Sequence, residues 1–261
     1  MVFQGKYILA AIDGTGSHEW KRINGSNSHT FKFYRDFNAA GGGKAYWDGP
    51  GEEFGGEVAG AGSGAIINGA VAFIQQQLSV IVGSDVNKFF QRNRLVSIRE
   101  RLEFLKEFEK TVRICLVGHS RGGLIAINVA NRLPVPVQFL GLYDAVDMHP
   151  VLDGDTITNA RTTYHAMRDP VIGSRSSWGN CGRSSTGTYF EKFFRTSHGG
   201  IGGDPVLRPN GATADYSCSI ETTSANIEAI LGSNRETYCI NQSLSADMWI
   251  RDGARKEGIQ I

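Results

Sequence analysis

A serine set between two glycines is the pattern in this sequence that most directly suggests chemistry. Ser120 lies in the Gly-x-Ser-x-Gly motif at residues 118–122, which is the spacing of a nucleophile elbow. The segment 113–117, which is apolar after Arg113, predicts a buried strand, and the apolar spacing from Leu124 onward predicts a helix. Such a turn would expose the Ser120 hydroxyl at a sheet edge and aim helix N–H groups at an oxyanion. The competing interpretation is a serine that only caps the helix.

A serine becomes a useful nucleophile only when a histidine base and an orienting acid are placed beside it. If the chain order is serine, acid, histidine, the candidate bases after Ser120 are His149, His165 and His198. His198 is the best candidate, because it alone follows a strong apolar strand, predicted at 189–194, and enters a glycine-rich loop.

Two aspartates that follow predicted strands are the candidates for the acid. Asp144 follows the strand at 137–143, and Asp169 follows a shorter strand at 162–167. Both would lie at the carboxyl edge of the sheet, and the pattern alone does not separate them. Either could instead be a turn residue that caps local backbone.

The elements that would position these residues alternate along the chain. The further predicted strands are 7–12 and 44–48, with 30–37 left as a strand or a short helix; the predicted helical regions are 66–78, 86–110, 224–230 and 244–254. Strands that alternate with helices predict an α/β fold with a mostly parallel central sheet covered on both faces. Without internal repeats or a long linker, residues 1–261 are expected to form a single domain.

Composition excludes some classes of function. The chain has 261 residues, of which 41% are hydrophobic, and a formal net charge of +1, so no general attraction to nucleic acid is expected. The glycines at 60–64 lack the rest of a dinucleotide-binding motif, and the four cysteines lack zinc-site spacing. We therefore expect no cofactor and no metal.

The cysteines and the apolar runs also bear on the cellular compartment. Cys115 falls inside a predicted strand, and free thiols are favoured over a disulfide for Cys181, Cys218 and Cys239. The apolar run at 7–12 is too short for a signal peptide or a membrane span, and no other transmembrane segment is expected. The sequence therefore predicts a soluble chain that is cytoplasmic as synthesised.

With these residues in place, the sequence resembles the serine hydrolase family that includes the type VI secretion phospholipase effectors, a branch of the α/β-hydrolase fold. The segments that carry the resemblance are 12–16, 118–123, 141–146 and 197–203, with 246–254 similar to the family's final helix. The resemblance covers only the family's hydrolase core, without its membrane-docking module. His119 stands where the family usually has an aromatic residue.

The resemblance implies roles for particular residues. It places the family's acid at Asp144, with Asp169 as the alternative, and its histidine at His198. Gly14 and Thr15 would flank the oxyanion, and the Arg121 backbone N–H would be the second donor.

The function implied is hydrolysis of acyl esters of lipids, as in a lipase or phospholipase, through Ser120, His198 and Asp144. The alternatives are an esterase or thioesterase for small acyl substrates and a catalytically inactive interaction module. The resemblance further implies peripheral contact with a membrane, delivery into a target cell by a type VI apparatus, and an immunity protein as partner.

Overall fold

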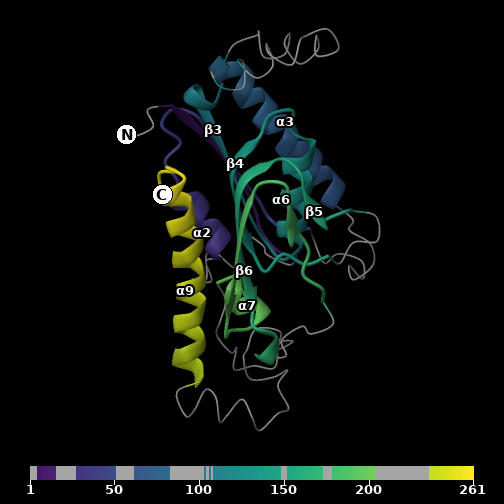
Figure 1. Cartoon of the computed structure of the whole chain (residues 1–261), viewed down its shortest axis with the longest axis vertical. Helices are drawn as coiled ribbons and strands as arrows, with labels where there is room; N and C mark the ends of the chain where they lie inside the picture. The colour runs from purple at the N-terminus through teal and green to yellow at the C-terminus, as the bar shows by residue number, and fades with distance from the viewer. Residues whose placement is uncertain are drawn as a thin grey trace.

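A six-stranded sheet forms the centre of the molecule (Figure 1). The computed structural model describes residues 5–15, 28–50, 62–82, 103, 106, 108–147, 152–172, 178–203 and 235–261. In sheet order the strands are β2 (Gly43–Trp47), β1 (Lys6–Ile12), β3 (Val112–His119), β4 (Val137–Tyr143), β6 (Ala160–Arg168) and β8 (Thr188–Phe194). Neighbouring strands of this sheet pair in parallel throughout. The predicted α/β class with a parallel sheet is confirmed.

Helices cover both faces of the sheet, as expected for parallel strands. Helices α3 (Ser63–Val82) and α6 (Arg121–Arg132) pack on one face, and α2 (His29–Asp36) and α9 (Arg235–Lys256) pack on the other (Figure 1). The short elements are β5 (Thr156–Ile157) paired with β7 (Ser184–Ser185), the 3-10 turn η1 (Pro170–Ile172) and α7 (His198–Ile201).

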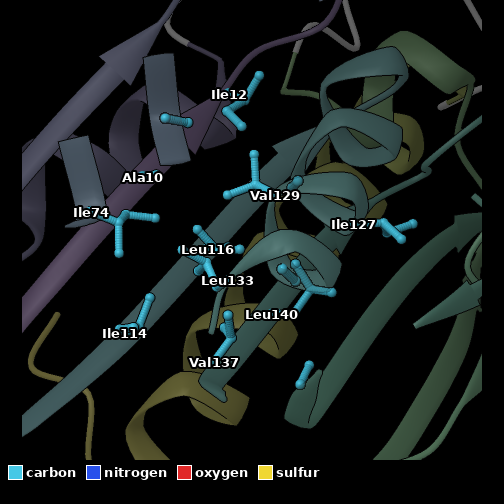
Figure 2. Close-up of a cluster of buried hydrophobic side chains, with 14 of the residues drawn as sticks. Ala10, Ile12, Ile74, Ile114, Leu116, Ile127, Val129, Leu133, Val137 and Leu140 are labelled. Carbon is cyan, nitrogen blue, oxygen red and sulfur yellow. The ribbon is translucent and has the colours of Figure 1, made fainter. Parts of the chain in front are cut away.

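Alternating side chains of each central strand bury into two separate hydrophobic cores. From β3, Leu116 points towards α3 and α6, where it meets Ile74 and Val129 (Figure 2). Its neighbour Val117 points the other way, into the cluster that contains Ile250 of α9. A strand buried on both sides needs apolar residues at every buried position, which explains why 114–117 is a continuous apolar run rather than an alternating one.

Some predicted elements differ from the structure. The ambiguous segment 30–37 is helical up to Asp36 as part of α2, whose first turn is capped because Ser28 Oγ accepts from Phe31 N. Helix α9 begins nine residues before the predicted start at 244, and His198 begins helix α7 instead of entering a loop. Nearly all of the predicted helical region 86–110, and all of 224–230, lie outside the described residues.

Of the described helices, α3 alone has the length and hydropathy of a membrane span, and 22% of its most apolar window is buried in the protein. Its buried residues Ile67, Ala70, Ile74 and Leu78 recur at helical spacing against the sheet and α6. These contacts are those of a helix that covers a sheet, so α3 is no clear transmembrane segment.

The cysteines divide into two groups. Cys115 in β3 and Cys181 are free and buried, whereas Cys239 in α9 is disulfide-bonded. The prediction that free thiols are favoured is therefore wrong for Cys239, because spacing in the sequence says nothing about which cysteines the fold brings together. Cys218 lies outside the described residues.

The carboxyl edge of the sheet collects the residues that the sequence singled out. Because β1 lies between β2 and β3, the strand order reverses at β1 and β3, and ligands of open α/β sheets bind in the crevice at such a switch point. Ser120 directly follows β3 there, and Asp144 follows the neighbouring β4.

Candidate active site

Ser120 occupies a strained turn between β3 and α6. Its φ is 56° and its ψ is −128°, a left-handed conformation that non-glycine residues seldom adopt. The turn is held from several sides: Ser120 N–H donates to Tyr143 O at 3.0 Å, and a Cβ on Gly122 would lie 2.3 Å from Asp13 O. A Cβ on Gly118 would lie 2.4 Å from Gly122 O, so both glycines of the motif are needed for this close packing.

His198 lies within hydrogen-bonding distance of the Ser120 hydroxyl. The distance from His198 Nε2 to Ser120 Oγ is 2.9 Å, and the two residues are 7% and 5% exposed. His198 is the first residue of α7, and Ser197 caps that helix by accepting from Gly200 N at 3.0 Å. The cap fixes the backbone that carries the imidazole.

Asp144 contacts the other nitrogen of the same ring. Its Oδ2 lies 2.7 Å from His198 Nδ1, and the side chain is completely buried. Because a carboxylate only accepts hydrogen bonds, Nδ1 carries the proton and Nε2 is left to accept from Ser120. Burial by itself would raise the pKa of Asp144, but the hydrogen bond and charge of His198, together with those of Arg168, hold that pKa well below its usual range.

Three further residues surround this pair, and the sequence reasoning missed all of them. Arg168 Nη1 donates to Asp144 Oδ2 at 2.5 Å, and Asn180 Nδ2 donates to Asp144 Oδ1 at 2.7 Å. The indole of Trp178 packs edge-on against the His198 ring, with centroids 5.1 Å apart. The one available signal was that Arg168 ends the strand next to the one that Asp144 follows.

The alternative acid and base candidates have other partners. Asp169 accepts from Arg195 Nε at 3.4 Å and from Val171 N at 3.1 Å, so the acid that the structure brings to His198 is Asp144. His165 is completely buried, and its Nε2 accepts from Ala145 N at 3.1 Å, which supports the turn after β4. His149 lies outside the described residues.

The loop after β1 lies beside Ser120, on the side opposite the acid. A Cβ on Gly14 would lie 3.1 Å from Ser120 Cβ, so this backbone borders the nucleophile as expected. The Gly14 N–H, however, donates to Asp13 Oδ1 at 2.9 Å rather than pointing freely into the site. Thr15 follows Gly14 in the loop, and Arg121 begins α6.

Asp13 organises that loop, and the sequence reasoning gave it no role. Its buried carboxylate accepts from Tyr46 Oη at 2.7 Å, from Ser28 Oγ and from Gly14 N. Tyr46 belongs to β2 and Ser28 caps α2, so one carboxylate ties the loop to two elements. Charge-assisted hydrogen bonds of this kind are stronger than neutral ones.

His119, the residue before the nucleophile, packs against His198 with ring centroids 4.9 Å apart. Its Nε2 lies 3.3 Å from His198 O, and its ring fills the space above Gly14 and Gly202, where a Cβ would come within 2.7 and 2.3 Å. Burial and the charge that His198 can carry lower the pKa of His119 to about 3, so the ring is neutral near pH 7. A flat neutral ring fills the place of the aromatic residue that the resemblance suggests.

His29 of α2 and Ser243 of α9 hold the backbone of α7 and of the residue after it. His29 Nε2 lies 3.0 Å from Ser243 Oγ, and that hydroxyl donates to Gly200 O at 2.6 Å. His29 N also donates to Gly202 O at 2.9 Å. The cluster therefore joins α2 and α9 to the segment that carries His198. Burial lowers the pKa of His29 to about 4.

The arrangement can transfer a proton from Ser120 to His198 while Asp144 holds the ring in place. Within the residues that the structure describes, no group of three His, Cys, Asp or Glu side chains is placed to hold a metal ion. Neither a comparison with protein-family models nor one with curated proteins gives a match for this chain.

Proposed function

We propose that this protein is a serine hydrolase of the α/β-hydrolase fold that cleaves carboxylic esters through an acyl-enzyme. The observation that carries the proposal is the hydrogen-bonded series Ser120–His198–Asp144, with the serine in a strained turn at the end of β3. Acyl transfer requires a serine at the sheet edge, a histidine whose free nitrogen faces that serine, and a buried acid. A serine that only caps a helix needs neither partner, and Ser120 makes no side-chain cap hydrogen bond.

In the proposed reaction, Ser120 Oγ attacks the ester carbonyl while His198 Nε2 takes the hydroxyl proton. Asp144 stays ionised and stabilises the imidazolium. When the tetrahedral intermediate collapses, His198 returns the proton to the leaving alcohol, and the acyl group stays on Ser120. A water molecule then repeats the two steps, with His198 as base and Ser120 as leaving group, and releases the carboxylic acid.

We assign the oxyanion contacts to backbone N–H groups of Thr15 and Arg121. Arg121 begins α6, so the positive end of the helix dipole lies beside Ser120. Gly14 borders the nucleophile, but its own N–H is engaged by Asp13, so its role is to allow close approach of the backbone. Loss of one such donor typically lowers turnover by about 100- to 1,000-fold.

The lipid substrate rests on the family resemblance and is tested by a chain-length series of nitrophenyl esters. A lipase or phospholipase prefers long acyl chains and is more active at a lipid interface. Preference for acetate or butyrate over palmitate, without interfacial activation, would identify the esterase or thioesterase alternative. Membrane contact, delivery by a type VI apparatus and an immunity partner rest on the same resemblance.

The central test is labelling of the purified protein by a fluorophosphonate, followed by mass mapping of the modified residue. We expect Ser120 to be modified, and the Ser120→Ala, His198→Ala and Asp144→Asn variants to lose labelling. Ser243→Ala is the matched control, because it removes a hydroxyl from a buried Ser–His pair that we do not assign to chemistry. Unmodified Ser120 in the wild-type protein would contradict the proposal and favour the inactive interaction module.

A further inference from the structure

Asp144 is surrounded by donors to an unusual degree for an acid that should pair with one histidine. Its Oδ2 accepts from His198 Nδ1 at 2.7 Å and from Arg168 Nη1 at 2.5 Å. Its Oδ1 accepts from Asn180 Nδ2 at 2.7 Å and from the Arg168 backbone N–H at 3.3 Å. A carboxylate offers about four acceptor positions, so these donors fill its capacity.

The guanidinium of Arg168 places a permanent positive charge against the acid. Arg168 is 6% exposed and Asp144 is fully buried, so water screens their attraction poorly. The His198 ring therefore faces a carboxylate whose charge is already balanced by a cation. A positive charge on His198 gains less from such a pair than from an unpaired carboxylate.

Among the described residues, the other titratable groups around this pair do not supply a cation near neutral pH. His119 packs on the His198 ring and His165 lies behind Asp144, and burial lowers their pKa values to about 3 and about 4. Asp13 is an acid, and its Oδ1 lies 3.9 Å from His119 Nδ1. Of these groups facing His198 and Asp144, Arg168 is the one that is charged positively at pH 7.

Arg168 also fixes the wall of the site. Its Nη2 donates to the Trp178 carbonyl, and the Trp178 indole packs edge-on against His198. One guanidinium thus connects the acid with the aromatic ring that confines the base. The planar fork of arginine suits this bridging role, and the point charge of lysine does not.

We propose that Arg168 is a positioning residue of the triad that holds Asp144 and Trp178 around His198 and, by its charge, offsets part of the attraction between Asp144 and a protonated His198. This inference rests on the proposed hydrolase function. The cost is a less stabilised imidazolium during the reaction, and the benefit is a site whose acid, base and aromatic wall are held in one arrangement.

The test is the pH dependence of kcat/KM for a nitrophenyl ester in two variants that separate charge from hydrogen bonding. Arg168→Gln keeps a donor without the charge. We expect the acidic limb of its kcat/KM profile to move up by about one pH unit, because removing a charge within a few ångströms has an effect of that size. Arg168→Lys keeps the charge but cannot bridge Asp144 and Trp178. It should lower kcat by roughly 10-fold and leave the acidic limb in place.

Two controls keep the outcome decisive. Arg195→Met removes an arginine from the exposed pair with Asp169 and should shift nothing. Arg168→Met is a second neutral variant, and thermal unfolding identifies which neutral variant is folded at the assay temperature. An unchanged acidic limb in a folded neutral variant would overturn the proposal.

Failure of this inference is distinguishable from failure of the proposed function. If fluorophosphonate does not modify Ser120 in the wild-type protein, the hydrolase function fails whatever the variants do. If Ser120 is modified but the neutral Arg168 variants keep the wild-type acidic limb, the function stands and only the role of Arg168 is refuted.

Discussion

Two sets of Ser, His and Asp lie among the described residues, and their comparison separates an arrangement that could activate a serine from one that could not. In the first, His198 is placed between Ser120 and Asp144 at hydrogen-bonding distance on both sides. Its protonated nitrogen faces the acid, so the other nitrogen can accept the serine proton. Every donor in this set points in the direction that activates the hydroxyl.

In the second set, His29 lies between Ser243 and Asp247, but the hydrogen bonds run the other way. Ser243 Oγ donates to Gly200 O, so it must accept from His29 Nε2, which therefore carries the proton. His29 Nδ1 is 3.8 Å from Asp247 Oδ2 and has no hydrogen-bond partner in the described part of the chain. The same three residue types therefore produce a structural anchor, because the tautomer is reversed and the serine proton is already committed.

The largest expected effect that separates the two sets is on turnover. Ser120→Ala should lower kcat/KM by about 10⁶-fold, because the nucleophile acts as a unit with its base. Ser243→Ala should change it by less than about 10-fold, since it removes the hydrogen bonds to Gly200 O and His29 Nε2 and leaves Ser120, His198 and Asp144 in contact. Steady-state ester hydrolysis measures both, and equal losses in the two variants would erase the distinction.

The next largest expected difference is between substitutions of the two acids, Asp144 and Asp247. Asp144→Asn should lower kcat by about 10⁴-fold with the fold retained, because an amide presents the wrong proton pattern to His198. Asp247 instead accepts from Tyr143 Oη and Arg251 Nε, both at 2.8 Å, so Asp247→Asn should mainly lower the melting temperature. Kinetics and thermal unfolding of both variants make the comparison, which fails if Asp247→Asn loses turnover like Asp144→Asn.

The set formed by Ser243, His29 and Asp247 should also make the stability of the protein depend on pH. Burial lowers the pKa of His29 from 6.5 to about 4, so the unfolded chain binds its proton first and stability falls as the pH drops from 6.5 to 4. At about 1.4 kcal/mol per pH unit, this costs the native state roughly 3 kcal/mol through His29. Urea unfolding across this range should show a shallower pH dependence in His29→Gln. Parallel curves for the two proteins would exclude His29 as a source.

The smallest expected effect comes from the disulfide at Cys239, one turn before Ser243 in α9. Cys239→Ser should lower the free energy of unfolding by roughly 2 kcal/mol while kcat stays within a few-fold. The reason is that the disulfide stabilises the part of α9 that carries Ser243 and does not touch Ser120, His198 or Asp144. Reductant should reproduce this loss in the wild-type protein and add nothing in Cys239→Ser. Cys181→Ser, which removes a free thiol, should keep the wild-type sensitivity to reductant.

Local patterns were sufficient to predict the central strands and the tight turn that carries Ser120. The continuous apolar run before Ser120 predicts a strand buried on both faces, and the glycines at 118 and 122 predict the tight turn, because both are consequences of neighbouring residues. Residues 30–37 stayed ambiguous between strand and helix, since a segment of that length shows little periodicity. The described helix there depends on its cap at Ser28.

Contacts between segments that are distant in the chain could not be predicted from local sequence patterns. Asp144 and Asp169 both end strands, and what distinguishes them is that Asp144 meets Arg168, Asn180 and His198, whereas Asp169 meets Arg195. The engagement of the Gly14 N–H by Asp13 depends likewise on how β1, β2 and α2 converge. The catalytic roles of Ser120, His198, Asp144 and the oxyanion contacts all remain predictions.

The separation of the site residues along the chain has a kinetic consequence. Ser120 and His198 are 78 residues apart, and Asp144 and His198 are 54 apart, so the site closes only after long loops have been ordered. Parallel sheets with such distant contacts fold slowly. During refolding, β3 and β4 can pair before His198 reaches Ser120, so Ser120 should still be unreactive at that stage. Reactivity towards a fluorophosphonate should appear last, and its time course should report when α7 docks beside Ser120.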